Sequence, residues 1–426
     1  MKEKRRTYLC IDMKSFFASV ECAERGLNPF ETNLVVADES RGKNALCLAI
    51  TPKMKALGVK NRCRMSDIPK NIDYLVAMPR MKKYIEYNGD IYEIYRKYID
   101  RDDIHVYSID EAFIDATDYL PVHKKTPKEF AKFLINEIAN KTHIPATAGI
   151  GTNLYLAKIA LDITAKKAPD HIGYLDEELF RETLWDHRPI TDFWGIANGT
   201  AKRLSNLAIY DMRGIANCPQ DLLYKRFGIN AELLIDHSWG RESCTMRDIK
   251  SYKSKSKSIS SSQILMKDYS FSEAAIVMAE MTLAGCHRLM SEHVITNGIS
   301  IFVGYSRDII PPTGGTVKMS ESTHVYSIIN RYVDKLFRET TNPNVPIRRL
   351  GICFNHIMDE GCEGYDLFTD FEKVEREKRL EHTVLDIKGK FGKNAMLRAI
   401  DLQEGATQVT RNKYIGGHNS EYCGSG

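Results

Sequence analysis

The stretch YSIDEAFID (residues 107–115) places two adjacent carboxylates, Asp110 and Glu111, in an otherwise apolar run. Residues 104–109 and 112–117 both have the composition of short buried strands, which predicts a hairpin with the two acids at its turn. Adjacent carboxylates repel each other, and each is costly to remove from water unless a partner is supplied. The question that the segment raises is what that partner is.

The flanking sequence predicts the order strand, helix, strand, strand, helix, strand. Residues 7–12 form an apolar run typical of a buried strand, and residues 81–98 carry aromatic and aliphatic side chains at helical spacing. A threonine followed by a proline at residues 126–127 is a typical helix start. Residues 146–151 complete the series as a last strand, before a helix that starts near residue 153.

This order brings a third acid to the hairpin. A right-handed crossover makes the first two strands parallel, and the next strand returns to lie beside the first. Asp12 ends the first strand, so it is expected at the same sheet edge as Asp110 and Glu111. An isolated Asp-Glu turn could equally be a solvated tip, but three converging carboxylates favour Mg²⁺. Two such ions about 3.5–4 Å apart are the arrangement used for in-line phosphoryl transfer.

Length and composition limit the number of domains and the class of protein. A chain of 426 residues suits two to four domains, and its 43% apolar content is ordinary for a globular protein. The net charge of +4 predicts no particular partner. Ten cysteines occur without CxxC spacing, and Cys353, His356 and Cys362 lack a fourth ligand, so reduced cysteines are expected. No segment has the length of a membrane span or a signal peptide, which predicts a cytoplasmic location.

Two segments resemble the metal-binding motifs of the Y-family translesion DNA polymerases. They are CIDMKSFFASVE (residues 10–21) and the YSIDEAFID stretch, and their pairing at this spacing is highly specific. The segments at residues 55–69 and 392–402 look closest to the UmuC-like, ImpB/MucB/SamB-type branch. The resemblance covers essentially the whole chain. It implies a template-directed, low-fidelity DNA polymerase that bypasses lesions and uses two Mg²⁺ ions.

The resemblance also implies an α+β multidomain fold. A ferredoxin-like palm (βαββαβ) carries a fingers insertion, and a helical thumb with a helix-hairpin-helix and a second βαββαβ little-finger domain follow. The expected boundaries are residues 1–16 and 81–168 for the palm, 17–80 for the fingers, 169–242 for the thumb, 243–257 for a basic linker, 258–358 for the little finger and 359–426 for a C-terminal tail.

By motif match, Asp12 and Asp110 would bridge both metals, and Glu111 would bind the catalytic-site metal. The backbone carbonyl of Met13 would complete the nucleotide-side metal. Many relatives carry a second acid two residues after the first, where this chain has Lys14, so that position is not expected to be a ligand.

The same loop is expected to meet the nucleotide. Phe17 corresponds to the family's steric gate, whose ring collides with a 2′-hydroxyl. Ser15 and Phe16 are also expected at the nucleotide, with simple packing as the alternative for Phe16. Lys55 and Lys158 are expected to face the triphosphate. At position 55 relatives often carry arginine, so this chain keeps the charge there but loses the bidentate fork.

Three regions are expected to meet DNA. Residues 193–212 resemble a helix-hairpin-helix, which presents backbone N–H groups to a phosphate, although Ala197 replaces the usual second glycine. Residues 247–260 alternate basic and small side chains like a solvated tether. The last strand of the second series carries two arginines on opposite faces. The expected DNA-binding residues are Gly195, Gly199, Lys202, Arg203, Lys253, Lys255, Lys257, Arg348 and Arg349.

The stretch GYDLFTD (residues 364–370) resembles the peptide that docks bacterial replication polymerases on the sliding clamp. Leu367 and Phe368 would fill an apolar groove, although the usual leading glutamine is Gly364 here. The alternative is a Leu-Phe pair folded back on the little finger. The remaining partners expected are primer-template DNA and a deoxynucleoside triphosphate, bound by a monomer.

Two other functions remain open from the sequence. A nucleotidyl cyclase uses a similar palm with paired carboxylates, but it would not need a helix-hairpin-helix or a basic tether. A non-catalytic DNA-binding scaffold could keep the polymerase shape, although the intact Asp12, Asp110 and Glu111 argue against it.

Overall fold

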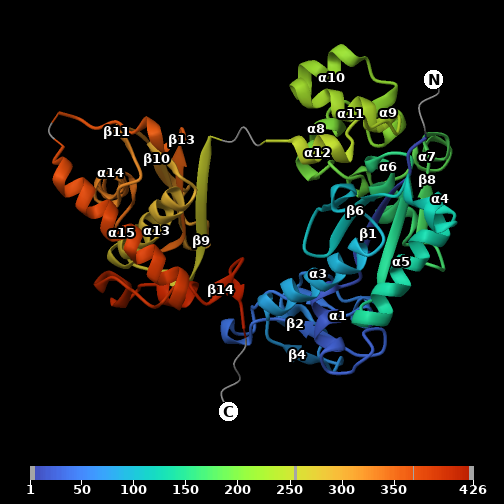
Figure 1. Cartoon of the computed structure of the whole chain (residues 1–426), viewed down its shortest axis with the longest axis horizontal. Helices are drawn as coiled ribbons and strands as arrows, with labels where there is room; N and C mark the ends of the chain where they lie inside the picture. Colours follow the sequence, from blue (N-terminus) through green and yellow to red (C-terminus); the bar gives the residue numbers. More distant parts are fainter. Residues whose placement is uncertain (1–4, 254–256, 368, 422–426) are drawn as a thin grey trace. The chain divides into compact units, whose positions relative to one another are not determined.

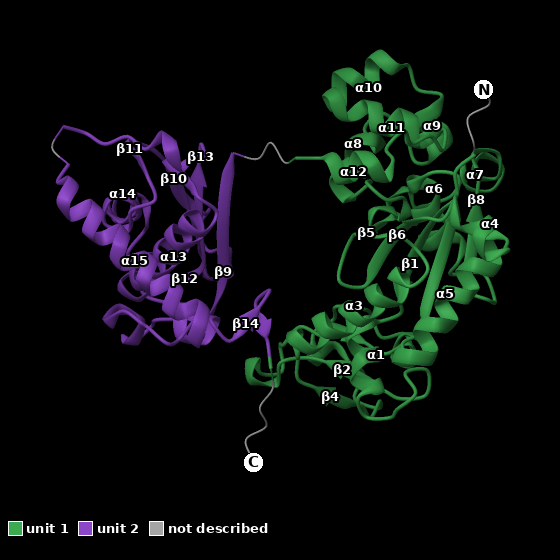
Figure 2. Ribbon diagram, viewed as in Figure 1, with its two compact units in different colours: residues 1–253, 421–426 green, residues 254–420 purple. Residues whose placement is uncertain are grey.

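The computed structural model describes residues 5–253, 257–367 and 369–421. The chain divides into two compact units, residues 1–253 with 421–426 and residues 254–420 (Figure 2). Lys255 and Phe368, both expected at binding surfaces, lie outside the described residues. Among the described helices, none is long and apolar enough to cross a bilayer.

The first unit is built on a five-stranded sheet in the order β5-β6-β1-β7-β8. Its strands β1, β6 and β8 are labelled in Figure 1. Both neighbours of β1 run antiparallel to it, and β8 runs parallel to β7. The predicted succession of strands and helices is confirmed, and the returning hairpin strand β6 does lie beside β1. The strands are β1 (Tyr8–Met13), β5 (Ile104–Val106), β6 (Glu111–Asp115), β7 (Ala146–Gly151) and β8 (Ile172–Leu175).

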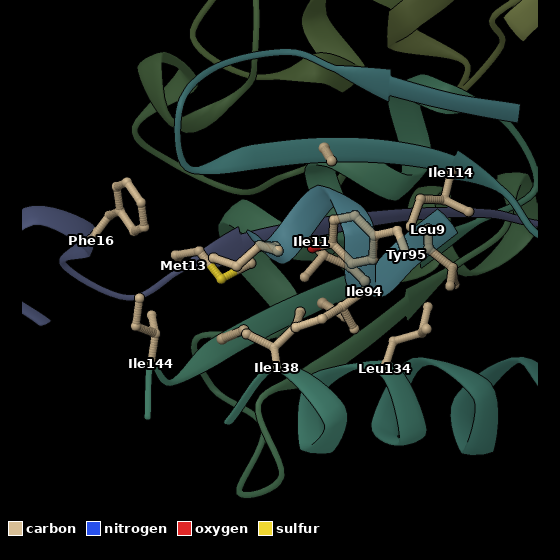
Figure 3. Packing of buried hydrophobic residues seen from close by; sticks show 14 of the residues in the cluster. Leu9, Ile11, Met13, Phe16, Ile94, Tyr95, Ile114, Leu134, Ile138 and Ile144 are labelled. Atoms are coloured by element: carbon tan, nitrogen blue, oxygen red, sulfur yellow. The ribbon is translucent and has the colours of Figure 1, made fainter. Parts of the chain in front are cut away.

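Alternation along β1 divides its side chains between two cores. Leu9, Ile11 and Met13 face the helices α3 (Met81–Arg96) and α5 (Pro127–Thr142) in the larger core (Figure 3). Tyr8 and Cys10 face the opposite way, into a smaller cluster with α6 (Leu154–Ile159). Asp12 follows the same alternation, so its carboxylate is on the α6 side of the sheet.

Helix α6 lies unusually close to β7 because glycine occupies the contact. A Cβ on Gly149 would lie 2.1 Å from the carbonyl oxygen of Ala157, and one on Gly151 would lie 2.2 Å from the Ala157 nitrogen. No side chain fits at either position. The Asn153 side chain caps the helix by accepting from the Leu156 N–H at 2.8 Å, which fixes where α6 begins.

A small sheet is inserted between β1 and α3, in the order β3-β2-β4. It has its own apolar cluster around Val35, Ile50 and Met54, while α1 packs into the larger core of the first sheet. The elements here are α1 (Phe16–Ala23), β2 (Leu34–Val36), β3 (Ala49–Ile50), α2 (Pro52–Ala56) and β4 (Leu75–Ala77).

The rest of the first unit is helical. Its elements are α4 (Tyr119–His123), α7 (Glu177–Leu184), α8 (Asn198–Ser205), α9 (Met212–Ala216), α10 (Gln220–Phe227), α11 (Ala231–Ser238) and α12 (Met246–Ser251). Helix α12 corrects the linker expected over residues 243–257. Thr245 and Asp248 form a capping box, and Met246 is buried beside Tyr8 and Phe113. The helix was not expected because the sequence of this region is dominated by alternating basic and small residues, whereas Met246 packs in the core.

The second unit repeats the succession βαββαβ with a different strand order. Its elements are β9 (Ser258–Tyr269), α13 (Phe271–Ser291), β10 (Val294–Tyr305), β11 (Thr313–Thr323), α14 (Tyr326–Thr340) and β12 (Ile347–Asn355). The predicted elements are confirmed to within a few residues. The order is β11-β10-β12-β9, so the fourth strand of the series separates the first two, whereas the third strand does so in the first unit.

The C-terminal segment up to residue 420 belongs to this second unit and is not a free tail. This segment contains the long helix α15 (Phe371–Phe391), which packs on α13 through a 2.6 Å contact between His287 Nε2 and Glu381 Oε2. The short elements of this region are β13 (Met358–Asp359), α16 (Gln408–Arg411), β14 (Tyr414–Ile415) and β15 (His418–Asn419).

Candidate active site

Three acids meet at one edge of the first sheet, as the sequence predicts. Asp12 on β1 and Glu111 on β6 are directly opposite each other in the antiparallel register, so their side chains share a face. The Met13 N–H donates to the carbonyl oxygen of Asp110 at 2.9 Å, which ties the turn to the end of β1. Residues a hundred positions apart therefore form one carboxylate cluster.

Asp12 is the acid that the protein itself does not neutralise. Burial, followed by the charges of Asp110 and Glu111, raises the pKa of Asp12 to about 7. In the described part of the chain, no residue donates a hydrogen bond to the Asp12 carboxylate. At neutral pH this group is therefore close to half protonated when no cation is bound.

Glu111 has a partner from α6. Lys158 Nζ lies 2.7 Å from Glu111 Oε2 and 3.2 Å from Asp162 Oδ1, while the Cys10 thiol donates to Glu111 Oε1 at 3.2 Å. Burial lowers the pKa of Lys158, but its hydrogen bond to Glu111 and the charges of Asp162 and Glu111 outweigh burial and raise it. Lys158, expected to face the triphosphate, is thus placed against the acid cluster and supplies part of its neutralising charge.

The cluster fits a hard divalent cation. Over the described ranges, no three His, Cys, Asp or Glu side chains are already drawn together at metal-ligand spacing. Lys158 holds Glu111, and the Ser108 hydroxyl holds Asp110 Oδ1 at 2.6 Å. The groups available to a cation are carboxylate oxygens, and Asp12 is half-buried without a hydrogen-bond donor among the described residues. This chemistry suits Mg²⁺, which the sequence predicts.

Two lysines lie near the acids, Lys14 and Lys55, and sequence reasoning assigned a role only to Lys55. Burial lowers the pKa of Lys55, and the charge of Lys166 lowers it further, while the charges of Asp12 and Asp110 raise it. Burial and the charge of Lys55 also lower the pKa of Lys14, which the charge of Asp12 raises. Lys166 is therefore near Lys55, which itself lies near the carboxylates. Lys166 was missed because it lies in a plain basic run after α6.

The aromatic pair lies on the loop that leaves the cluster. Ser15 adopts a left-handed conformation (φ 50°) that turns the chain from β1 into α1, and its hydroxyl is buried without a described partner. Phe16 is buried in the core, which favours the packing alternative for this residue. Phe17 is partly buried and stacks on Tyr84 with ring centroids 4.5 Å apart. Tyr84 is a contact that the sequence did not indicate.

The residues expected to contact DNA at the hairpin differ in their conformation and contacts. Gly195 has φ +89° at the start of the hairpin, and nothing lies within 4 Å of a Cβ on Gly199, so backbone there is open. Lys202 is exposed. Arg203 is also exposed, although its guanidinium lies 4.3 Å from the Phe227 ring centroid and donates to the Arg226 carbonyl oxygen. Its contact with DNA stays a prediction.

The expected basic residues of the second unit are also partly engaged. Arg349 pairs with Asp308, and Arg348 Nη1 lies 3.6 Å from Asp268 Oδ1. Because the neighbouring Leu350 is buried and side chains alternate along β12, Arg349 lies on the face away from the core. Lys253 and Lys257, on either side of the undescribed residues 254–256, are both exposed.

The segment with the clamp-like sequence is tied to the second unit near its start by Gly364 and Tyr365, and Asp370 at its end caps α15. Gly364 forms a β-bridge with Ser322 on β11, and the side chain of Leu367 is 98% exposed. The alternative in which Leu367 folds back on the second unit is therefore wrong for that residue.

The fold is that of the Y-family DNA polymerases. The structure matches a solved Y-family DNA polymerase chimera with a TM-score of 0.62 and 21% identity, covering 83% of this chain and 99% of that one. The model of the impB/mucB/samB family matches residues 11–162, and that of the impB/mucB/samB family C-terminal domain matches residues 256–367. The chain belongs to this family, which confirms the resemblance seen in the sequence.

Curated relatives match over nearly the whole chain. The putative UV-damage repair protein UvrX of Bacillus subtilis is 30% identical over 98% of both chains. DNA polymerase IV 2 of the same organism is 31% identical over 98% of this chain and 99% of its own. DNA polymerase IV 2 of Halalkalibacterium halodurans is 29% identical over 96% and 98%.

The raised pKa of Asp12 predicts how Mg²⁺ binding depends on pH. Metal binding needs the ionised carboxylate, so protons compete below the pKa of about 7. Mg²⁺ affinity measured by calorimetry should be about tenfold weaker at pH 6 than at pH 8. Asp102→Asn, at an exposed acid outside the cluster, should keep this profile. A constant affinity across that range would contradict the assignment of Asp12.

Proposed function

We propose that this chain extends a DNA primer opposite damaged template and that Asp12, Asp110 and Glu111 hold the two divalent metals of the reaction. The observation that carries the metal assignment is the cross-strand pair Asp12 and Glu111, with Asp110 in the adjoining turn. The proposed polymerase activity is supported by family membership and by the relatives that are named DNA polymerases. The reaction is attack of the primer 3′-hydroxyl on the α-phosphate of a deoxynucleoside triphosphate.

The chain's own groups prepare the site for this reaction. Lys158 holds the carboxylate of Glu111 in place, and Ser108 orients Asp110. The cationic side chains of Lys14, Lys55 and Lys166 offset triphosphate charge that the metals leave. The chemistry that magnesium supplies in such a site is a lower pKa for the attacking hydroxyl and stabilisation of the departing pyrophosphate.

The domain roles follow the family pattern. We assign the first sheet with α3 and α5 as the palm, the small inserted sheet as the fingers, the helices from α7 to α11 as the thumb, and the second βαββαβ unit as the little finger. Helix α12 moves the start of the linker from residue 243 to 252. Backbone at Gly195 and Gly199 is the proposed phosphate contact of the thumb.

Primer extension is favoured over the two alternatives from the sequence. The relatives described above carry polymerase or repair names, whereas a nucleotidyl cyclase would have no use for the helical region that holds Gly195. A non-catalytic scaffold would have no need for a buried carboxylate cluster, because such a cluster costs stability unless it binds cations.

Asp110→Ala tests the proposed function. The variant should lose at least about a hundredfold of primer-extension rate on damaged and undamaged templates, since metal stabilisation of the transition state is worth several kcal/mol. Asp90→Ala, at an exposed acid on α3, is the matched control and should retain full activity. Extension that survives in Asp110→Ala would refute the metal assignment, and a wild-type protein without extension would refute the function.

Phe17→Ala tests the proposed steric gate. Removing the ring should raise ribonucleotide incorporation relative to deoxyribonucleotide about tenfold or more, because a pocket contact of this size discriminates on that scale. Phe17→Tyr keeps a ring against Tyr84 and should keep the discrimination. For each variant, the ratio of ribonucleotide to deoxyribonucleotide incorporation is measured by competition between the two in single-turnover extension. Unchanged discrimination in Phe17→Ala means that the gate lies elsewhere.

We propose in addition that Leu367 docks on a sliding clamp. Its full exposure next to an anchored backbone suits an anchor side chain for an apolar groove. Leu367→Ala should lower clamp-dependent synthesis about tenfold and leave synthesis without the clamp unchanged. Leu402→Ala, at another exposed leucine, is the control. Equal loss with and without the clamp would assign the residue a structural role.

A further inference from the structure

The turn that carries Asp110 is secured by the palm on one side. The Ser108 hydroxyl donates to Asp110 Oδ1 at 2.6 Å, and the Met13 N–H donates to the Asp110 carbonyl oxygen at 2.9 Å. Asn88 Nδ2 of α3 donates to the carbonyl oxygen of Ile109 at 2.8 Å. These bonds define the turn, but all of them come from the sheet and the helix beneath it.

An aromatic contact secures the same turn from the helical region. Tyr107, the first residue of the turn, lies perpendicular to Phe113 of β6 with ring centroids 5.7 Å apart. Its other neighbour is Trp194, at 5.9 Å and an interplanar angle of 84°. Trp194 Nε1 donates to the Tyr107 hydroxyl at 3.2 Å. Tyr107 is thus held between its own sheet and a residue of the thumb.

Trp194 is the residue immediately before the proposed DNA-binding hairpin. Gly195, with its positive φ, follows it directly. On its other side, the Trp194 ring is roughly parallel to His237 of α11, with centroids 6.5 Å apart. His237 in turn stacks on Tyr155 at 3.9 Å and contacts Glu242 at 3.0 Å. The indole therefore packs against α11 on one side and Tyr107 on the other, directly before the hairpin backbone.

We propose that Trp194 and Tyr107 are positioning residues that couple DNA held at the hairpin to the geometry of the Asp110 carboxylate. The inference rests on the proposed function. Tyr107 is 47% exposed, so the contact adds little to the core and is not required for folding. It lies three residues from a carboxylate whose position controls metal binding, where a small displacement is costly to the reaction. Bound DNA would thereby raise the affinity of the carboxylate cluster for Mg²⁺.

Trp194→Phe and Tyr107→Phe each remove the connecting hydrogen bond and keep a ring. Each variant should raise the Mg²⁺ concentration for half-maximal primer extension about three- to tenfold, the scale of one net hydrogen bond. The double variant should show no further increase, because both changes remove the same bond. Affinity for primer-template DNA, measured by fluorescence anisotropy without Mg²⁺, should stay within about twofold of wild type.

Trp185→Phe is the matched control. Trp185 also donates one indole hydrogen bond, to the Ser238 carbonyl oxygen at 2.7 Å, and its ring lies edge-to-face against Trp239. This variant should keep the wild-type Mg²⁺ requirement. An unchanged Mg²⁺ requirement in Trp194→Phe, or a loss confined to DNA affinity or thermal stability, would overturn the proposal.

A second measurement does not depend on catalysis. The chain has three tryptophans, so the variant Trp185→Phe/Trp239→Phe leaves Trp194 as the sole indole. Its fluorescence should change on titration with Mg²⁺, and at lower Mg²⁺ concentration when primer-template DNA is present. Asp110→Ala should abolish the change. Fluorescence that does not respond to Mg²⁺ contradicts the coupling, whereas a wild-type protein that fails to extend primers contradicts the proposed function alone.

Discussion

Repulsion among three carboxylates at one sheet edge is the constraint around which the first unit is arranged. Asp12 and Glu111 are cross-strand neighbours, and both are removed from bulk water. Such a pair is unfavourable unless a cation is nearby. The protein supplies one cation permanently, Lys158 on Glu111, and leaves Asp12 without a donor from any described residue. Partial neutralisation keeps the acids together while retaining affinity for a divalent ion.

The permanent cation depends on how closely α6 approaches the sheet. Gly149 and Gly151 let the helix backbone lie directly on β7, and Lys158 on that helix then reaches across to Glu111 of β6. A side chain at either glycine would push the helix outward and lengthen the ion pair. Two residues with no chemistry of their own thus set the electrostatics of the cluster. They belong to the site as much as the acids do.

The sequence predicts what local patterning determines. Strand composition, the hairpin and the capped helix at Thr126 are local, and together they predict the convergence of Asp12 with Asp110. Contacts set by packing could not be predicted in the same way. The partner of Lys158 depends on the helix–strand distance, and the contact of Arg203 with Phe227 depends on how two helices pack. The two βαββαβ series also differ in strand order. The sequence could not predict this difference, because the alternation and spacing of side chains do not indicate which strand lies between the first two.

The packing of α15 and the residues after it has a consequence for dividing the chain into parts. The family's C-terminal model ends at residue 367, yet Glu280 on α13 is buried and accepts its hydrogen bonds from the backbone N–H groups of Thr407 and Gln408. A fragment that ends at residue 367 would lack the N–H groups that donate to Glu280. It would also expose apolar side chains of α13 that the C-terminal residues cover. Expression of the isolated module therefore requires the chain through about residue 420.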